Sequence, residues 1–301
     1  MLDLYKRIWR FTGRSQILLI ILSILIAVLA AVPLQFQKDI INGITTSMER
    51  KTLFLLGAGY LGVLVVRNAL KFALQYKSSM LSEDVVRRIR GRLYEVGFET
   101  TDRGTLVTMI STEAEEVGRF AGSAMASPLM QLGTLLTVIA YVAVNQPYLG
   151  LFMITIVVPQ ALIAVSVQQR INERIGYRVR VLRSATARIA ADDIKSAGDA
   201  VLHDFDEIYE ARRKIFFLKF STKFAMNLIT GVGTVGILVL GGLLALKGRT
   251  DVGTVVAALS GLTRVSEPWR ELLAFYRDLS SVRVKYELLL NVRPDNRMGR
   301  S

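Results

Sequence analysis

The chain has 301 residues, of which 51% are apolar, with a formal net charge of +13 and no cysteine. The absence of cysteine excludes disulfides, thiolate metal sites and a cysteine nucleophile. The basic charge alone would fit a nucleic-acid-binding protein, but no zinc spacing, RNA-binding aromatic motif or basic low-complexity tail accompanies it. The apolar residues are gathered into long stretches that would lack cover in water, so the composition favours a membrane protein.

The first predicted element is a short interfacial helix at residues 1–14, in which an apolar side that includes Trp9 opposes a basic side. A simple basic flank to the first span is the alternative. The segment 17–34 is apolar apart from Ser23, which is long enough to cross a hydrocarbon core of about 30 Å. That length and the lack of an A-x-A site disfavour a cleaved signal peptide. A polar outer loop is expected at 35–51.

Five more spans are predicted, joined by short outer turns and long inner extensions. Helical periodicity in the second, fourth and fifth spans continues past the membrane, so these helices are expected to extend well into water. The sixth span is the weakest by hydropathy, because four residues between 264 and 270 are charged or proline. The predicted helices start at about 53, 111, 147, 204 and 252, with breaks or turns at 97–105, 145–148, 196–198 and 247–251.

Lys and Arg residues are divided unevenly between the two sides of the predicted membrane. Segments on one side hold 31 of them, and those on the other hold five. By the positive-inside rule the rich side is cytoplasmic, which places both termini there. The predicted fold class is therefore an all-α membrane protein with six transmembrane helices and long cytoplasmic extensions, located in the bacterial inner membrane.

Three stretches carry a resemblance to a known family. Residues 104–120, GTLVTMISTEAEEVGRF, are similar to the G-x-x-x-[ST]-x-x-x-x-D-x-x-x-x-x-x-F stretch between the second and third spans of ATP-binding-cassette (ABC) exporters. VGTVVAAL at 252–259 and PWRELL at 268–273 are similar to the sixth helix of that family. The stretch 193–204 departs from the family pattern, with Asp199 where an aliphatic residue is common.

The chain thus resembles the transmembrane domain of an ABC exporter over nearly its whole length. The implied organisation is an elbow helix at 1–14, a six-helix transmembrane domain at 15–290, and a polar tail at 291–301 where a nucleotide-binding domain would begin. The resemblance also implies a homo- or heterodimer that forms the substrate pathway by alternating access.

The sequence contains neither a G-x-x-x-x-G-K-[ST] motif nor an acidic strand end for Mg²⁺. The chain is therefore not expected to be an enzyme or to hold a cofactor on its own. The resemblance implies that ATP and Mg²⁺ bind to a partner nucleotide-binding domain or ATPase subunit. The alternative is an ATPase-independent transporter or assembly adaptor on the same scaffold. A proton-driven transporter would need a buried acid in mid-span, and the six apolar runs contain none.

By resemblance, two inner turns near 108–117 and 195–202 are coupling helices that rest on the ATPase. Their acids would pair with basic groups or lie at helix starts, where negative charge is favoured. A solvated acidic face is the alternative, and Glu115 and Glu116 are expected to be solvated. The candidate coupling residues are Thr108, Ser111, Thr112, Glu113, Glu116, Lys195, Ser196, Gly198 and Asp199.

A substrate pathway is predicted from polar residues within the spans. A spacing of four places Arg67, Lys71 and Gln75 on one helical stripe, and charge inside a membrane is costly unless it faces water or a partner. Such a cavity would favour anionic groups on cargo, whereas the alternative is that both cations extend to the head groups. Arg264, Glu267, Arg270 and Glu271 lie at i+3 and i+4 spacing on the sixth helix and are expected to pair with one another. The candidate pathway residues are Arg67, Asn68, Lys71, Gln75, Gln131, Asn227 and Arg264.

Overall fold

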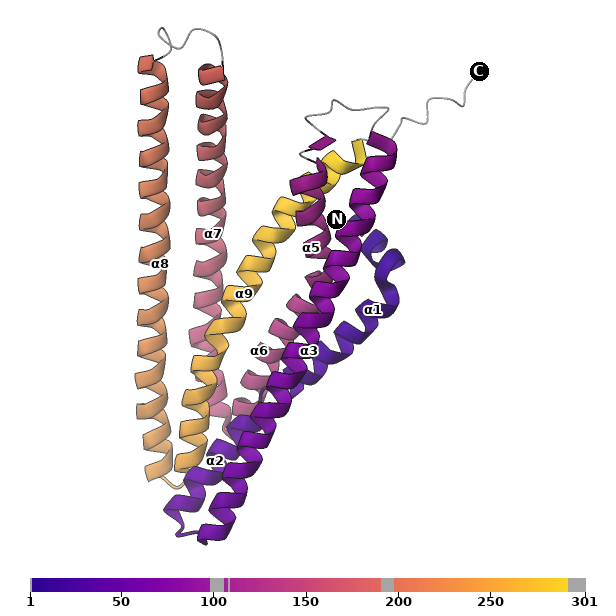
Figure 1. Ribbon diagram of the computed structural model, residues 1–301. Coiled ribbons are helices and arrows are strands. Elements are labelled where there is room, and N and C mark those ends of the chain that lie inside the picture. The colour runs from indigo at the N-terminus through magenta and orange to yellow at the C-terminus, as the bar shows by residue number, and fades with distance from the viewer. Residues whose placement is uncertain (1, 98–105, 108, 191–197, 292–301) are drawn as a thin grey trace. The chain divides into compact units, whose positions relative to one another are not determined.

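The computed structural model describes residues 2–97, 106–107, 109–190 and 198–291, and within them all regular structure is helical (Figure 1). The elements are α1 Leu2–Val28, α2 Val32–Thr45, α3 Arg50–Gly97, a π-helical turn η1 Met109–Glu113, α5 Ala114–Ser123, α6 Ala126–Asn145, α7 Pro147–Ala190, α8 Gly198–Leu246 and α9 Val252–Asn291. The predicted tail lies outside these residues from 292 onward.

Within the described residues, five helical segments are long and apolar enough to cross a membrane, judged by length and composition. They are Thr12–Thr45, Arg50–Glu95, Met109–Asn145, Pro147–Thr186 and Gly198–Leu246. The all-α membrane fold is therefore confirmed. Helix α9 is long enough but lacks an apolar stretch of the required hydropathy with few enough charged residues, so its crossing of the membrane stays a prediction.

The chain forms two compact units, residues 1–150 with 244–301 and residues 151–243. In the first unit, α6 packs against α1 and α9, α2 packs against α3 and α9, and α3 packs against α5. Leu19, Ile26 and Leu34 are almost completely buried in this unit. In the second unit, α7 and α8 run side by side (Figure 1), and the side chain of Gln160 donates to the hydroxyl of Thr230 at 3.0 Å.

The predicted polar loop at 35–51 is wrong over most of its length, because α2 continues to Thr45. The polar residues of this segment are used inside the bundle. Gln35 donates to Asp39 one turn along at 2.9 Å, and Lys38 donates to Asn145 of α6 at 2.6 Å. At the other end, α1 runs without interruption through residue 14, so no break in the helix separates the predicted elbow from the span.

The start of α9 is fixed by a hydrogen-bonded cluster around Asp251. Its Oδ1 accepts from the backbone N–H of Thr254 at 2.6 Å and from the side-chain amide of Asn42 on α2 at 2.7 Å. The oxygen of that amide accepts from the N–H of Gly253 at 2.8 Å. Asp251 is thus the N-cap of α9, and Asn42 ties this cap to α2.

We expect Asp251→Ala to destabilise the chain by about 1 kcal/mol, the usual value of an N-cap. Burial opposes ionisation of Asp251, but hydrogen bonds from Asn42 and Thr254 outweigh it and lower the pKa of the carboxyl below 3.8. A carboxyl whose pKa is lower in the folded state stabilises the fold at pH values above its unfolded-state pKa. This contribution is lost as the pH falls through its folded-state pKa. Thermal unfolding in detergent from pH 6 to pH 3 should therefore show a steeper loss for the wild type than for Asp251→Asn, and parallel curves would contradict this role.

Candidate functional site

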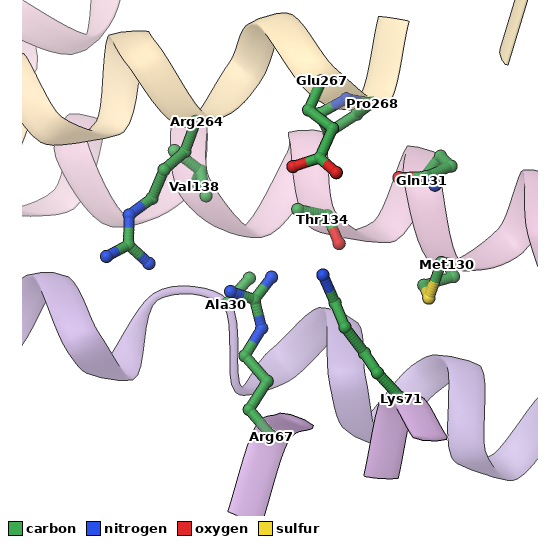
Figure 2. Close-up of a pocket in the computed structure, with 10 residues that line it drawn as sticks. All are labelled: Ala30, Arg67, Lys71, Met130, Gln131, Thr134, Val138, Arg264, Glu267 and Pro268. Atoms are coloured by element: carbon green, nitrogen blue, oxygen red, sulfur yellow. The ribbon is translucent and has the colours of Figure 1, made fainter. Parts of the chain in front are cut away.

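A cavity opens between α3, α6, α9 and the junction of α1 with α2 (Figure 2). Its volume is about 70 Å³, and it is partly open to its surroundings. Its lining comes entirely from the first unit: Ala30, Arg67, Lys71, Met130, Gln131, Thr134, Val138, Arg264, Glu267 and Pro268. Charged groups from α3 and α9 therefore share one space with apolar groups from α6 and from the helix junction.

The junction exists because the first predicted span is two helices. Helix α1 ends at Val28 and α2 begins at Val32, and Ala30 between them lies in the cavity wall. Pro33 lies in the first turn of α2, where its missing N–H is tolerated, but it cannot continue the ladder of α1. The helix restarts with the N–H of Leu34 donating to the carbonyl of Ala31 at 2.9 Å. Pro33 thus sets the position of the break between α1 and α2, and this break forms one wall of the cavity.

Three cations and one carboxylate line the cavity. In Figure 2 the guanidinium groups of Arg67 and Arg264 point into the same space from α3 and α9, and the amino group of Lys71 points toward the side of Glu267. In the part of the chain that the structure describes, no ion pair of 4.0 Å or less involves any of the three cations. The Nε atom of Arg67 is buried and has no hydrogen-bond partner. The lining therefore carries two formal positive charges in excess, without a close ion pair.

Arg67 and Arg264 lie closer to the first residue of their helices than the thickness of a hydrocarbon core. Arg67 is 17 residues from the first residue of α3, about 25 Å at 1.5 Å per residue. Arg264 is 12 residues from the first residue of α9, about 18 Å. Both lengths are shorter than a hydrocarbon core of about 30 Å.

The structure brings together four of the seven predicted pathway residues, namely Arg67, Lys71, Gln131 and Arg264. Asn68 and Gln75 are exposed on α3 and do not line the cavity. Asn227 is exposed on α8, in the second unit.

The predicted pairing of Arg264, Glu267, Arg270 and Glu271 with one another is wrong. Among the described residues no ion pair joins any of these four side chains. Figure 2 shows Arg264 and Glu267 entering the cavity at separate points. Glu267 and Thr134 line the cavity but were not among the predicted pathway residues, although a threonine inside an apolar span was a usable signal.

The first predicted coupling segment forms η1 and the start of α5, with Thr108 outside the described residues. Ser111 and Thr112 are exposed on this turn, whereas Oε2 of Glu113 is buried without a hydrogen-bond partner. The structure adds Val107, whose side chain is 65% exposed just before the turn. An exposed apolar residue beside exposed hydroxyls gives the turn a surface that a partner can cover.

Basic residues of α3 and α9 hold this turn in place. Arg90 on α3 donates from Nε to the carbonyl oxygen of Ile110 at 2.9 Å, and its guanidinium lies 3.2 Å from the carboxylate of Glu115. Glu116 forms an ion pair with Lys285 of α9. Glu115 and Glu116 were expected to be solvated; their side chains are 44% and 42% exposed, and each also contacts a basic group within the chain.

The second predicted coupling segment is described only in part, because Lys195 and Ser196 fall outside the described residues. Gly198 and Asp199 begin α8, and Asp199 is exposed in the first turn. A carboxylate is favoured there by the positive end of the helix dipole.

The sequence model of the family described as ABC transporter transmembrane region matches residues 16–174, just over half of the chain. The matched residues include the helix break, the charged stripe of α3, the turn η1 and the cavity residues of α6. No curated protein matches the sequence. The chain belongs to the ABC transporter transmembrane family, and it is an integral membrane protein that forms the transmembrane component of an ABC transporter.

Proposed function

We propose that the chain is one half of an ATP-driven, exporter-type transporter of the bacterial inner membrane. Two such chains would enclose the substrate path, and a nucleotide-binding domain or ATPase subunit would bind ATP and Mg²⁺. The excess of Lys and Arg in the inner segments favours cytoplasmic termini. Closure of the ATPase would move the two inner turns, and the helices would then expose the cavity to the other side. The chain itself contributes a difference in cargo affinity between the two states.

The observation that carries this proposal is the attachment of the first turn to both charged helices. Arg90, which holds η1, lies on the same helix as Arg67 and Lys71. Lys285, which pairs with Glu116, lies on the same helix as Arg264 and Glu267. Movement of the turn would therefore be passed to α3 and α9 together.

A packed core supports this connection. Phe120 and Val117 of α5 are buried against Val282 of α9 and Ile8 of α1. The ring of Phe120 also stacks on that of Phe275 of α9, with centroids 5.5 Å apart. Because close-packed interiors transmit displacement instead of absorbing it, α5 and α9 should move as one piece.

The test is purification of the full-length protein with its ATPase in mild detergent, followed by an ATPase assay. We expect Val107→Asp combined with Thr112→Arg to reduce ATPase activity in the purified complex at least about tenfold, since about 1.4 kcal/mol of lost docking energy is enough. Both side chains are exposed, so the fold should be retained.

Glu83→Arg is the matched control, because Glu83 is an exposed residue of α3 away from the turn. It should leave ATPase recovery and activity unchanged. Full activity in the double variant would overturn the coupling role of the turn. Recovery of the wild-type protein without any ATPase, separate or fused, would favour the ATPase-independent alternative.

A further inference from the structure

The charges of the cavity lack a close counter-charge. Arg67, Lys71 and Arg264 are all partly buried, and Glu267 is the one carboxylate among the lining residues that the structure describes. Charged side chains within a membrane persist where they face partners, water or a ligand. A binding partner for this space should therefore be negative.

The geometry separates the three cations into two groups. Figure 2 shows the amino group of Lys71 on the side of the cavity that holds Glu267 and Thr134. The guanidinium groups of Arg67 and Arg264 instead approach each other from opposite helices. Two guanidiniums that face one space suit an oxyanion, because each presents parallel N–H donors that match the oxygens of a phosphate or carboxylate. The unpartnered Nε of Arg67 is a further donor for such a group.

Apart from Gln131 and Thr134, the rest of the lining is apolar. Ala30, Met130, Val138 and Pro268 contribute side chains without charge or hydrogen-bonding hydrogen. Small-molecule sites commonly combine apolar walls with a few placed polar groups. A ligand that carries an anionic head on an apolar body would use both parts of the cavity.

We propose that the cavity binds an amphiphilic anion, with Arg67 and Arg264 holding a phosphate-like or carboxylate head and the apolar wall holding the adjoining hydrocarbon. Glu267 opposes the bound charge and so limits affinity, which favours release. This inference rests on the proposed function only in using the same cavity as the path for cargo. Binding itself requires neither ATP nor the ATPase.

The experiment is calorimetric titration of the full-length protein in dodecyl maltoside, without ATP, using dodecyl phosphate as the probe. Dodecyl phosphocholine carries the same tail without net charge, and inorganic phosphate carries the head without a tail. We expect saturable binding of dodecyl phosphate and binding at least about tenfold weaker for each comparison probe. Equal affinity for inorganic phosphate would overturn the proposed role of the apolar tail and indicate a site for free anions. Equal affinity for dodecyl phosphocholine would overturn the proposed requirement for a negatively charged ligand.

Variants locate the site. Arg67→Gln and Arg264→Gln should each weaken dodecyl phosphate binding about tenfold or more, and Glu267→Gln should strengthen it about threefold or more. Lys247→Gln, an exposed cation in the outer turn, should have no effect. If Arg67→Gln fails to fold, Arg67→Lys keeps the charge and should still weaken binding. Unchanged affinity in folded arginine variants overturns the proposal.

The variant that combines Val107→Asp with Thr112→Arg should bind dodecyl phosphate with unchanged affinity. Failure of ATPase coupling and failure of anion binding are therefore distinguishable.

Discussion

Gly122→Ala is expected to be among the most damaging single-methyl changes in the chain, lowering stability by about 3 kcal/mol, the upper end for overpacking. A Cβ at this position would overlap the carbonyl oxygen of Ser78 and the hydroxyl of Ser82, both on α3. A backbone carbonyl cannot rotate away as a flexible side chain can, so α3 and α5 must separate. The measurement is the thermal unfolding midpoint of the purified protein in detergent.

Gly118 shows that this contact is a continuous seam and not one tight point. A Cβ at Gly118 would lie 2.8 Å from the backbone nitrogen of Val86, two turns along α3 from Ser78. Small residues four apart allow such close approach of helices. Gly91→Ala is the control, because nothing lies within 4 Å of a Cβ there, and it should be neutral or slightly stabilising. Equal unfolding temperatures for Gly122→Ala and Gly91→Ala would show that the seam opens freely.

The helices were predictable from the sequence where hydropathy and helix-breaking residues agree. Pro147 does begin α7, and the turn at 247–251 does separate α8 from α9, with Gly248 at a φ of 65°. The predicted break at 97–105 lies outside the described residues from 98 onward. Segment 35–45 was mistaken for a loop because its polar residues looked solvated. Polar side chains that bond to neighbouring helices give the same composition as a loop, and one sequence does not distinguish them.

The candidate cavity was predictable only in part, for reasons of geometry. Spacing by four overshoots one helical turn by about 40°, so the stripe that starts at Arg67 and Lys71 has drifted by about 80° at Gln75. This drift agrees with the exposure of Gln75 outside the cavity. Glu267 was assigned to a pair on its own helix because position i+3 makes that possible. The direction of the Glu267 side chain is set instead by the face of α9 that packs against α2 and α6. That packing depends on residues distant in the chain.

Glu267→Lys is expected to be the most disruptive change within the cavity, because it raises the formal excess charge of the lining from two to four. On insertion scales a lysine costs about 2.5 to 3.5 kcal/mol at the centre of a spanning helix, which sets the upper limit for residue 267 in the predicted sixth span. Repulsion from Arg67, Lys71 and Arg264 adds to this cost. We expect a lower yield of folded protein from membranes and a lower thermal unfolding midpoint, partly restored in high salt, since the cavity is open and salt screens exposed charges.

Two comparisons separate cavity charge from general damage to α9. Glu271→Lys makes the same change one turn along α9, at a residue that does not line the cavity, and should have a much smaller effect. The double variant Lys71→Glu, Glu267→Lys returns the formal excess to two, with the charges exchanged across the space shown in Figure 2. It should recover most of the lost stability, because the summed charge of the lining is the quantity that the membrane penalises. If the exchange is as damaging as Glu267→Lys alone, the position of Glu267 matters more than the balance, and Lys71 and Glu267 must act through contacts specific to each side chain.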